Sequence, residues 1–106
     1  MENTEMIAFQ VISNAGAAKS NYMEAITKAE EGDFEKAEKL IEEGYENYKK
    51  AHEVHQGLVS KEAAGGQVTM SLILTHAEDQ LITSEVIKLI AEQNIKLRKE
   101  IERLNG

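Results

Sequence analysis

The chain has 106 residues, with 12 basic and 19 acidic side chains, a formal charge of −7 at pH 7, and neither cysteine nor proline. This length suits a single domain over residues 1–106, and the negative charge disfavours nucleic acid as a partner. Without cysteine there is no disulfide, no thiolate zinc site and no catalytic thiol. The acidic start and the lack of a run of about 18 apolar residues predict a cytoplasmic protein that does not insert into the membrane.

The composition predicts an all-α fold, because Ala, Glu, Lys, Ile and Leu are abundant and glycine is confined to a few places. The first predicted helix covers residues 4–31. Residues recurring along it at steps of three and four form one stripe, made of Ile7, Val11, Ala15, Ala18, Tyr22, Ala25 and Ala29. Gly32 can adopt positive φ after this helix and Asp33 can cap the next, so we expect an antiparallel helical hairpin.

The second predicted helix covers residues 34–62 and is amphipathic along its length. Its predicted inner stripe has near-heptad spacing and consists of Phe34, Ala37, Ile41, Tyr45, Tyr48, His52, His55 and Val59. His52 and His55 lie three residues apart, but two ligands do not complete a metal site, so packing is the favoured role for both rings. The segment 63–67, which contains two glycines, ends the helical pattern.

The third predicted helix covers residues 68–104 and is apolar over much of the circumference of its first half. Two helices of the same chain can cover only part of this surface, so we expect the remainder to meet other copies of the protein in a homo-oligomer. Beyond Ile95 the pattern narrows to a seam of coiled-coil type, formed by Leu97, Ile101 and Leu104.

His76 is the most informative residue of this helix, and the polar residues Glu78, Asp79 and Gln80 follow it closely. Burying a polar group costs free energy unless the group finds a partner, so a histidine in an apolar run needs a hydrogen-bond partner or a function. From the pattern alone, a core histidine held by hydrogen bonds is the favoured interpretation.

Several features occur in a specific order along almost the whole chain. A helix is followed by the turn Gly32-Asp33-Phe34, a second helix, Lys61-Glu62-Ala63 with glycines after it, and finally Leu74-Thr75-His76-Ala77-Glu78-Asp79-Gln80-Leu81-Ile82-Thr83. This order resembles the enzyme IIA component of the lactose and cellobiose branch of the bacterial phosphoenolpyruvate-dependent sugar phosphotransferase system. The last segment is similar to the phosphohistidine segment of that family, which makes a functional role the favoured interpretation of His76.

The resemblance implies a phosphocarrier. In this family a histidine accepts a phosphoryl group from the phosphohistidine of HPr and passes it to a cysteine of the cognate IIB component, during uptake of a disaccharide such as lactose, cellobiose or chitobiose. By match, that histidine is His76. A neutral imidazole nitrogen is a good nucleophile near pH 7, and the transfer needs mainly in-line positioning and donors for the phosphoryl oxygens. Gln80, one helical turn from His76, can supply an amide donor.

The resemblance also implies a homotrimer of antiparallel, spectrin-repeat-like three-helix bundles. The three aspartates that match Asp79 would converge on the symmetry axis around a divalent cation, without which buried carboxylates would repel one another. Oxygen ligands favour a hard ion, so we expect a structural Mg²⁺. An interhelical salt bridge or a cap-like hydrogen bond is the alternative role for Asp79.

Two positions depart from the family pattern. Family members often carry glutamine where this chain has Glu78, and histidine where it has Gln80. Both residues are predicted neighbours of the phosphoryl site, so the hydrogen bonds there must differ from those of such members. Glu78 points about 200° away from His76 on the helix, which would let it serve a neighbouring subunit's site or form a salt bridge with a lysine.

Two other classes of function are weighed against a phosphocarrier. The stronger is a non-catalytic helical oligomerisation or scaffold module, in which His76 is incidental and Asp79 only fixes the register of the helices. The weaker is a tetratricopeptide module, because residues 32–37 look like part of such a repeat. A repeat protein would carry a second copy about 34 residues away, and the sequence has none.

Overall fold

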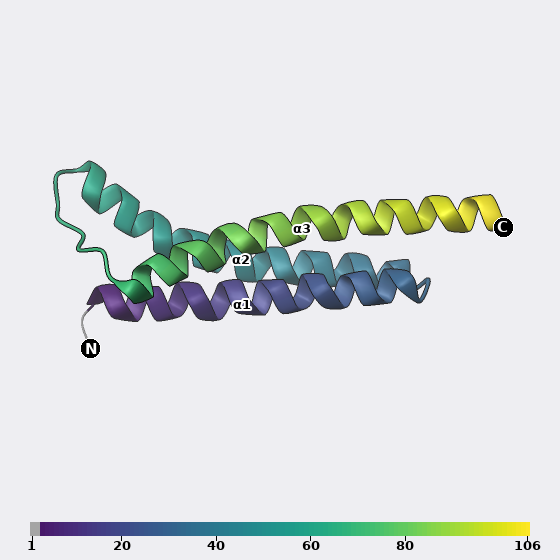
Figure 1. Cartoon of the computed structure of the whole chain (residues 1–106), viewed down its shortest axis with the longest axis horizontal. Helices are drawn as coiled ribbons and strands as arrows, with labels where there is room; N and C mark the ends of the chain where they lie inside the picture. The colour runs from purple at the N-terminus through teal and green to yellow at the C-terminus, as the bar shows by residue number, and fades with distance from the viewer. Residues whose placement is uncertain (1–2) are drawn as a thin grey trace.

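Three long helices make up nearly all of the described chain, residues 3–106. In the computed structural model α1 covers Asn3–Glu30, α2 covers Phe34–Ala63 and α3 covers Leu72–Asn105, with no strand in this part of the chain. Each helix runs antiparallel to the one before it, so α1 and α3 point the same way (Figure 1). The bundle measures 58 × 23 × 19 Å. The predicted all-α, antiparallel three-helix fold is therefore confirmed.

The inner face of α1 consists mainly of alanine. Six of the seven predicted stripe residues are buried, and Ala8 takes the place of Ile7; the buried residues are Ala8, Val11, Ala15, Ala18, Tyr22, Ala25 and Ala29. Small side chains allow neighbouring helices to approach closely. Tyr22 is the large exception, and its ring packs on Gly44 of α2, where an added Cβ would lie 2.4 Å from the ring.

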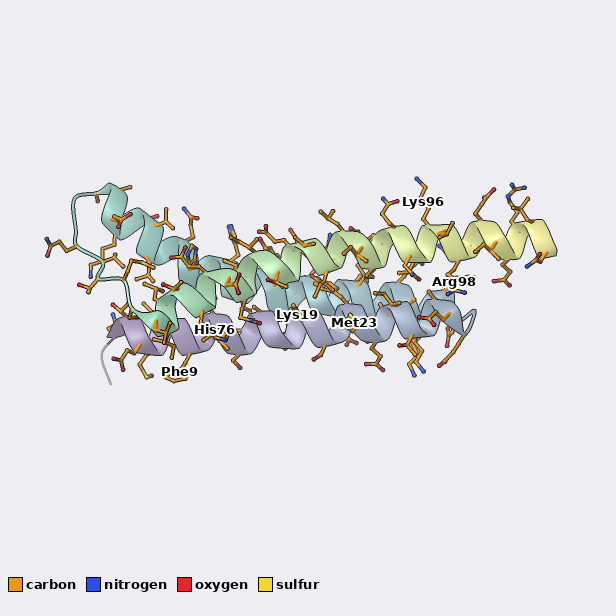
Figure 2. The ribbon with its side chains drawn as sticks, viewed as in Figure 1. Phe9, Lys19, Met23, His76, Lys96 and Arg98 are labelled. Atoms are coloured by element: carbon orange, nitrogen blue, oxygen red, sulfur yellow. The ribbon has the colours of Figure 1, made fainter. Side chains whose placement is uncertain are left out.

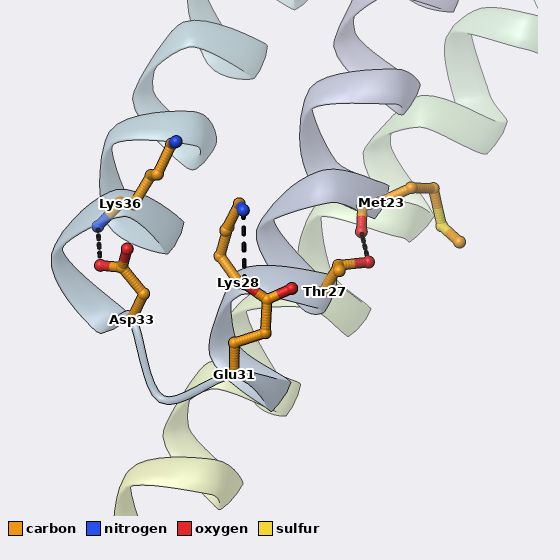
Figure 3. A network of polar contacts seen from close by, with 6 residues as sticks. All are labelled: Met23, Thr27, Lys28, Glu31, Asp33 and Lys36. Atoms are coloured by element: carbon orange, nitrogen blue, oxygen red, sulfur yellow. Dashed lines mark hydrogen bonds and ion pairs between the residues drawn. The ribbon is translucent and has the colours of Figure 1, made fainter.

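A tight turn joins α1 to α2 as the sequence predicts. Gly32 has a φ of +82°, a conformation that side-chain-bearing residues rarely adopt. Asp33 is the N-cap of α2, and its carboxylate accepts a hydrogen bond of 3.1 Å from the Lys36 amide (Figure 3). On the α1 side of the same turn, Lys28 pairs with Glu31 at 3.3 Å. These interactions fix the antiparallel hairpin.

The inner stripe of α2 lies next to the predicted one. Its buried residues are Ala37, Leu40, Gly44, Ala51 and Leu58. Of the predicted residues, Tyr45 is 42% exposed and Val59 is 44% exposed, and His52 is also exposed. The prediction that these three face the core was wrong, because the close approach of α1 selects small residues for the contact and leaves the longer side chains at its edge.

α3 begins at Leu72, four residues later than the predicted start at Val68. Ser71 is the N-cap, with an extended backbone and a hydroxyl that accepts a hydrogen bond of 3.1 Å from the Leu74 amide. Val68 instead lies in the non-helical connection from α2, where it packs against the core around Val11. The connection carries the chain from the far end of α2, which diverges from α1, back to the N-terminal end of α1 (Figure 1).

α3 has one buried face and one exposed apolar face. Leu74, Ala77, Leu81, Ser84, Ala91 and Ile95 are buried. Eight large apolar residues on the opposite side are between 42% and 88% exposed, namely Leu72, Ile82, Val86, Leu89, Ile90, Leu97, Ile101 and Leu104. We call these eight residues the apolar face of α3. The C-terminal end of α3 extends beyond the turn between α1 and α2 (Figure 1). No helix in the described range is long and apolar enough to cross a membrane.

Candidate functional site

His76 lies on the second turn of α3 and is exposed. The Ser71 cap sets the start of this helix, and the side chain of Thr75 also bonds to the Ser71 carbonyl oxygen at 2.9 Å. Helical geometry places His76 between the apolar face and the buried face, on the flank toward α1. Figure 2 shows His76 where α3 lies beside the N-terminal half of α1. The interpretation of His76 as a core histidine is therefore wrong, and its ring is accessible to a protein partner.

Gln80 lies one turn beyond His76 on the same flank, in agreement with the predicted spacing. It is half-buried, and its Oε1 accepts a hydrogen bond from the ammonium group of Lys19 on α1. The two residues are 61 positions apart in the sequence. No pattern in the sequence connects Lys19 with this segment. The one signal that could have indicated it is that Lys19 is the first basic residue of the chain.

Asp79 is exposed on the same side of α3 as the apolar face. Its backbone oxygen accepts a hydrogen bond of 2.7 Å from Thr83, but its carboxylate forms no ion pair among the residues of the described chain. The predicted alternative of an interhelical salt bridge is therefore not formed within one chain. An unpaired carboxylate beside exposed leucine and isoleucine is a chemically suitable donor for a hard cation if further copies bring theirs to the same place.

Glu78 faces α2 and not the flank that carries His76. Its Oε2 lies 3.7 Å from Nε2 of His55, which replaces the lysine partner considered from the sequence. Both residues border a hollow of about 130 Å³ between α2 and α3, together with Leu58, Val68 and Leu74. Within residues 3–106 no three His, Cys, Asp or Glu side chains come close enough to hold a metal ion, so His52 and His55 do not form a metal site with their neighbours here.

Two tyrosines help to hold the helices at the site in place. The Tyr48 hydroxyl of α2 donates a hydrogen bond to Glu85 of α3. Burial, followed by this hydrogen bond and the charge of Glu85, raises the pKa of Tyr48 above its ordinary value. Tyr22 is fully buried, and burial, followed by the charges of Glu92 and Tyr45, raises its pKa to about 12. Both phenols therefore stay neutral at physiological pH and contribute as packing groups.

Comparison with known proteins adds an independent observation. Residues 6–99 match the family model described as the PTS system, lactose/cellobiose specific IIA subunit. The lichenan-specific phosphotransferase enzyme IIA component of Bacillus subtilis is 36% identical over 105 residues, which cover 99% of this chain and 96% of that protein. The lactose-specific EIIA component of Staphylococcus aureus strain N315 is 35% identical over 98 residues, covering 92% of this chain and 95% of the relative.

Solved structures give the same result. The crystal structure of the PTS cellobiose-specific enzyme IIA from Bacillus anthracis matches with a TM-score of 0.94 and 34% identity, covering 97% of this chain and 94% of that one. The IIA(Chitobiose) component, solved in complex with HPr of the N,N′-diacetylchitobiose branch of the Escherichia coli phosphotransferase system, matches with a TM-score of 0.82 and 28% identity, covering 96% and 99%. From its sequence and its fold, the chain belongs to the lactose/cellobiose family of phosphotransferase-system IIA subunits.

Proposed function

We propose that this IIA subunit is a phosphocarrier that holds the phosphoryl group on His76. The observation that carries the proposal is the place of His76, which is exposed on the second turn of α3 in a chain that belongs to the IIA family. A phosphoryl donor that is itself a protein can reach only a nucleophile at the surface. The imidazoles of His76 and His52 are exposed and meet this requirement, whereas His55 is half-buried between α2 and α3. Of the two exposed histidines, only His76 lies in the segment that resembles the phosphohistidine segment of the family.

The chemistry needs an unprotonated ring nitrogen on His76. Its lone pair attacks the phosphorus of the donor's phosphohistidine, so that one N–P bond breaks while another forms on His76. The phosphoramidate keeps enough free energy for a second transfer, to a thiolate. Positioning of the two proteins and donors for the equatorial oxygens supply most of the rate acceleration in such reactions. The half-buried amide of Gln80 is one donor within a helical turn.

HPr is the proposed donor and a cysteine of the cognate IIB component the proposed acceptor. The first is supported by the complex of the Escherichia coli chitobiose IIA component with HPr, to which this chain is similar over 96% of its length. The transported sugar would be a disaccharide of the lactose, cellobiose or chitobiose class. This assignment predicts a location in the cytoplasm, where both partners would be encountered.

We further propose that the subunit works as a homotrimer in which Asp79 of each copy meets a structural Mg²⁺ on the axis. The support is the apolar face of α3, whose eight large exposed side chains form the kind of apolar surface that marks a protein–protein interface. Asp79 lies on this same side, with its carboxylate unpaired in the described chain. Association through this face would bring like charges together, and a hard divalent cation would neutralise them. The ion would be structural.

Mass spectrometry of the intact protein tests the relay and its residue. The chain is incubated with phosphoenolpyruvate, enzyme I and HPr, and compared with His76→Gln. We expect the unsubstituted protein to gain one phosphoryl group, about 80 Da, and His76→Gln to gain none. His52→Gln and His55→Gln are matched controls, because these are the other two histidines of the chain, and both should still be phosphorylated.

The outcomes separate the alternatives. Phosphate uptake by His76→Gln would place the acceptor at another residue. No uptake by the unsubstituted protein, with HPr shown to be phosphorylated, would favour the helical scaffold. Helical content and oligomeric state should be unchanged in His76→Gln, since His76 is exposed and contributes little to packing.

A further inference from the structure

Lys19 is the lysine that the fold brings to the part of α3 that carries His76 and Gln80. It projects from α1, is half-buried, and donates a hydrogen bond to Oε1 of Gln80 on α3. In Figure 2 Lys19 and His76 lie on the same side of the molecule, where α1 and α3 run next to each other. A long cationic side chain usually keeps its end in water, so a half-buried ammonium bonded across two helices requires a reason.

The hydrogen bond determines which end of the Gln80 amide is free. An ammonium group has donors only, so it can bind only the carbonyl oxygen of the amide. The NH₂ group of Gln80 must therefore point away from Lys19. Side chains of a helix lean toward its N-terminus, which for Gln80 is the direction of the turn that carries His76. Lys19 thus leaves the donor end of the amide available to an acceptor bound on His76.

The negative charge around His76 makes a nearby cation such as Lys19 favourable. The chain has a net charge of −7, and residues 72–87 of α3 contain three acidic residues and no lysine or arginine. A phosphoryl group on His76 would add a further charge of about −1.5 to −2. Lys88, the next basic residue along α3, pairs with Glu92 at 3.4 Å and lies over the Tyr45 ring of α2. Within residues 3–106, Lys19 is the one lysine or arginine whose side chain forms a hydrogen bond or ion pair with residues 72–87, where the other basic contact is that of His55 with Glu78.

We infer that Lys19 is a positioning residue of the phosphoryl site. It holds the Gln80 amide so that the NH₂ group donates to a phosphoryl oxygen on His76, and its ammonium group offsets part of the charge that phosphorylation adds. This inference rests on the proposed function of His76. It also explains how glutamine can work at a position where histidine is common in the family: an amide has a donor end and an acceptor end, and Lys19 orients it.

The test compares Lys19→Met, which removes the ammonium group and keeps a long side chain, with Lys19→Arg, which keeps a cationic donor. Lys28→Met is the matched control, because Lys28 is also half-buried on α1 but pairs with Glu31 in the turn that directly follows its own helix. Single-turnover phosphorylation by phospho-HPr is measured over a range of HPr concentrations. We expect Lys19→Met to lower the limiting rate about tenfold or more, with Lys19→Arg recovering most of it, because removal of one oriented donor has effects of this size or larger.

A double-mutant cycle shows whether Lys19 acts through Gln80. In a Gln80→Leu background, Lys19→Met should have much less effect than in the unsubstituted protein, because the amide that it orients is gone. The ³¹P resonance of the phosphorylated protein gives a readout that a purely structural role would not change. Loss of the ammonium group should move its pH titration to higher pH, since the dianionic phosphoryl group loses a nearby cation.

The two proposals fail in different ways. If the unsubstituted protein takes up no phosphoryl group on His76, the proposed function is wrong. If it does, and Lys19→Met reacts as fast as Lys28→Met with an unchanged ³¹P titration, the role of Lys19 is wrong and that of His76 stands. If Lys19→Met lowers the rate by the same factor in the unsubstituted protein and in Gln80→Leu, action of Lys19 through Gln80 is excluded.

Discussion

Gly44 of α2 offers a sharp test of how closely α1 and α2 pack. In Gly44→Ala the new Cβ would lie 2.4 Å from Cε1, 2.8 Å from Cδ1 and 3.0 Å from Cζ of Tyr22. The ring is fully buried, so it cannot move aside without displacing a neighbouring helix. Overpacking of this kind costs about 1–3 kcal/mol, whereas alanine gains about 1 kcal/mol over glycine inside a helix. We expect the free energy of unfolding to fall by about 1 kcal/mol.

Gly57→Ala is the matched control in the same helix. No atom lies within 4 Å of the Cβ that it adds, so only the helix propensity should count, and stability should rise by about 0.5–1 kcal/mol. Urea unfolding followed by circular dichroism, at equal chain concentrations, measures both variants. If Gly44→Ala is as stable as Gly57→Ala, the close contact between α2 and the Tyr22 ring is wrong.

Three further predictions concern assembly and pH. Asp79→Leu should abolish Mg²⁺ binding and leave the oligomer intact or strengthened, because apolar groups can replace a buried charge cluster; metal retained after dialysis would contradict the axial site. Val86→Glu should weaken self-association in sedimentation experiments by placing a charge on the apolar face of α3, and an unchanged assembly would exclude that face as the interface. Burial, then the charges of Glu92 and Tyr45, raises the Tyr22 pKa from 10.0 to about 12. The contribution of Tyr22 to the free energy of unfolding should therefore keep its full value below pH 10 and fall toward pH 12, because Tyr22 loses its proton at a lower pH in the unfolded chain than in the folded one. Tyr22→Phe should make this fall smaller, leaving the part due to Tyr48, at little cost near pH 7, because the buried Tyr22 hydroxyl has no hydrogen-bond partner in the described chain.

The helices and the α1 stripe could be predicted from the sequence because both depend on local periodicity. The inner stripe of α2 could not, because apolar spacing does not tell a core position from one at its edge. Tyr45 shows why: its ring is 42% exposed, with the ammonium groups of Lys49 and Lys88 at 5.2 and 5.1 Å from its centroid. Cations over an aromatic face make such a half-exposed position favourable. The late start of α3 depends on the Ser71 cap, a signal present in the sequence that the apolar pattern obscured.

The candidate site could also be predicted only in part from the sequence. The spacing of His76, Asp79 and Gln80 is fixed by the helix, so their directions could be predicted from the sequence. The partners of this segment could not, because they come from other helices. Lys19 meets Gln80 across 61 positions, and His55 meets Glu78 from α2. Those contacts depend on the register of one helix against another, which is set by the packing of small residues and by the connection 64–71.

The directions in which α3 presents its side chains make assembly and phosphoryl transfer compatible. Association through the apolar face would cover Asp79 but leave the flank that carries His76 at the rim of the interface, still open to a protein donor. An anionic Glu78 beside the phosphoryl group would repel it, but Glu78 points toward His55 on the other flank of α3. Lys19 lies on the His76 flank through its bond to Gln80. The carboxylate of Glu78 and the ammonium group of Lys19 thus lie on opposite flanks of α3, with Lys19 on the flank where phosphorylation would add negative charge.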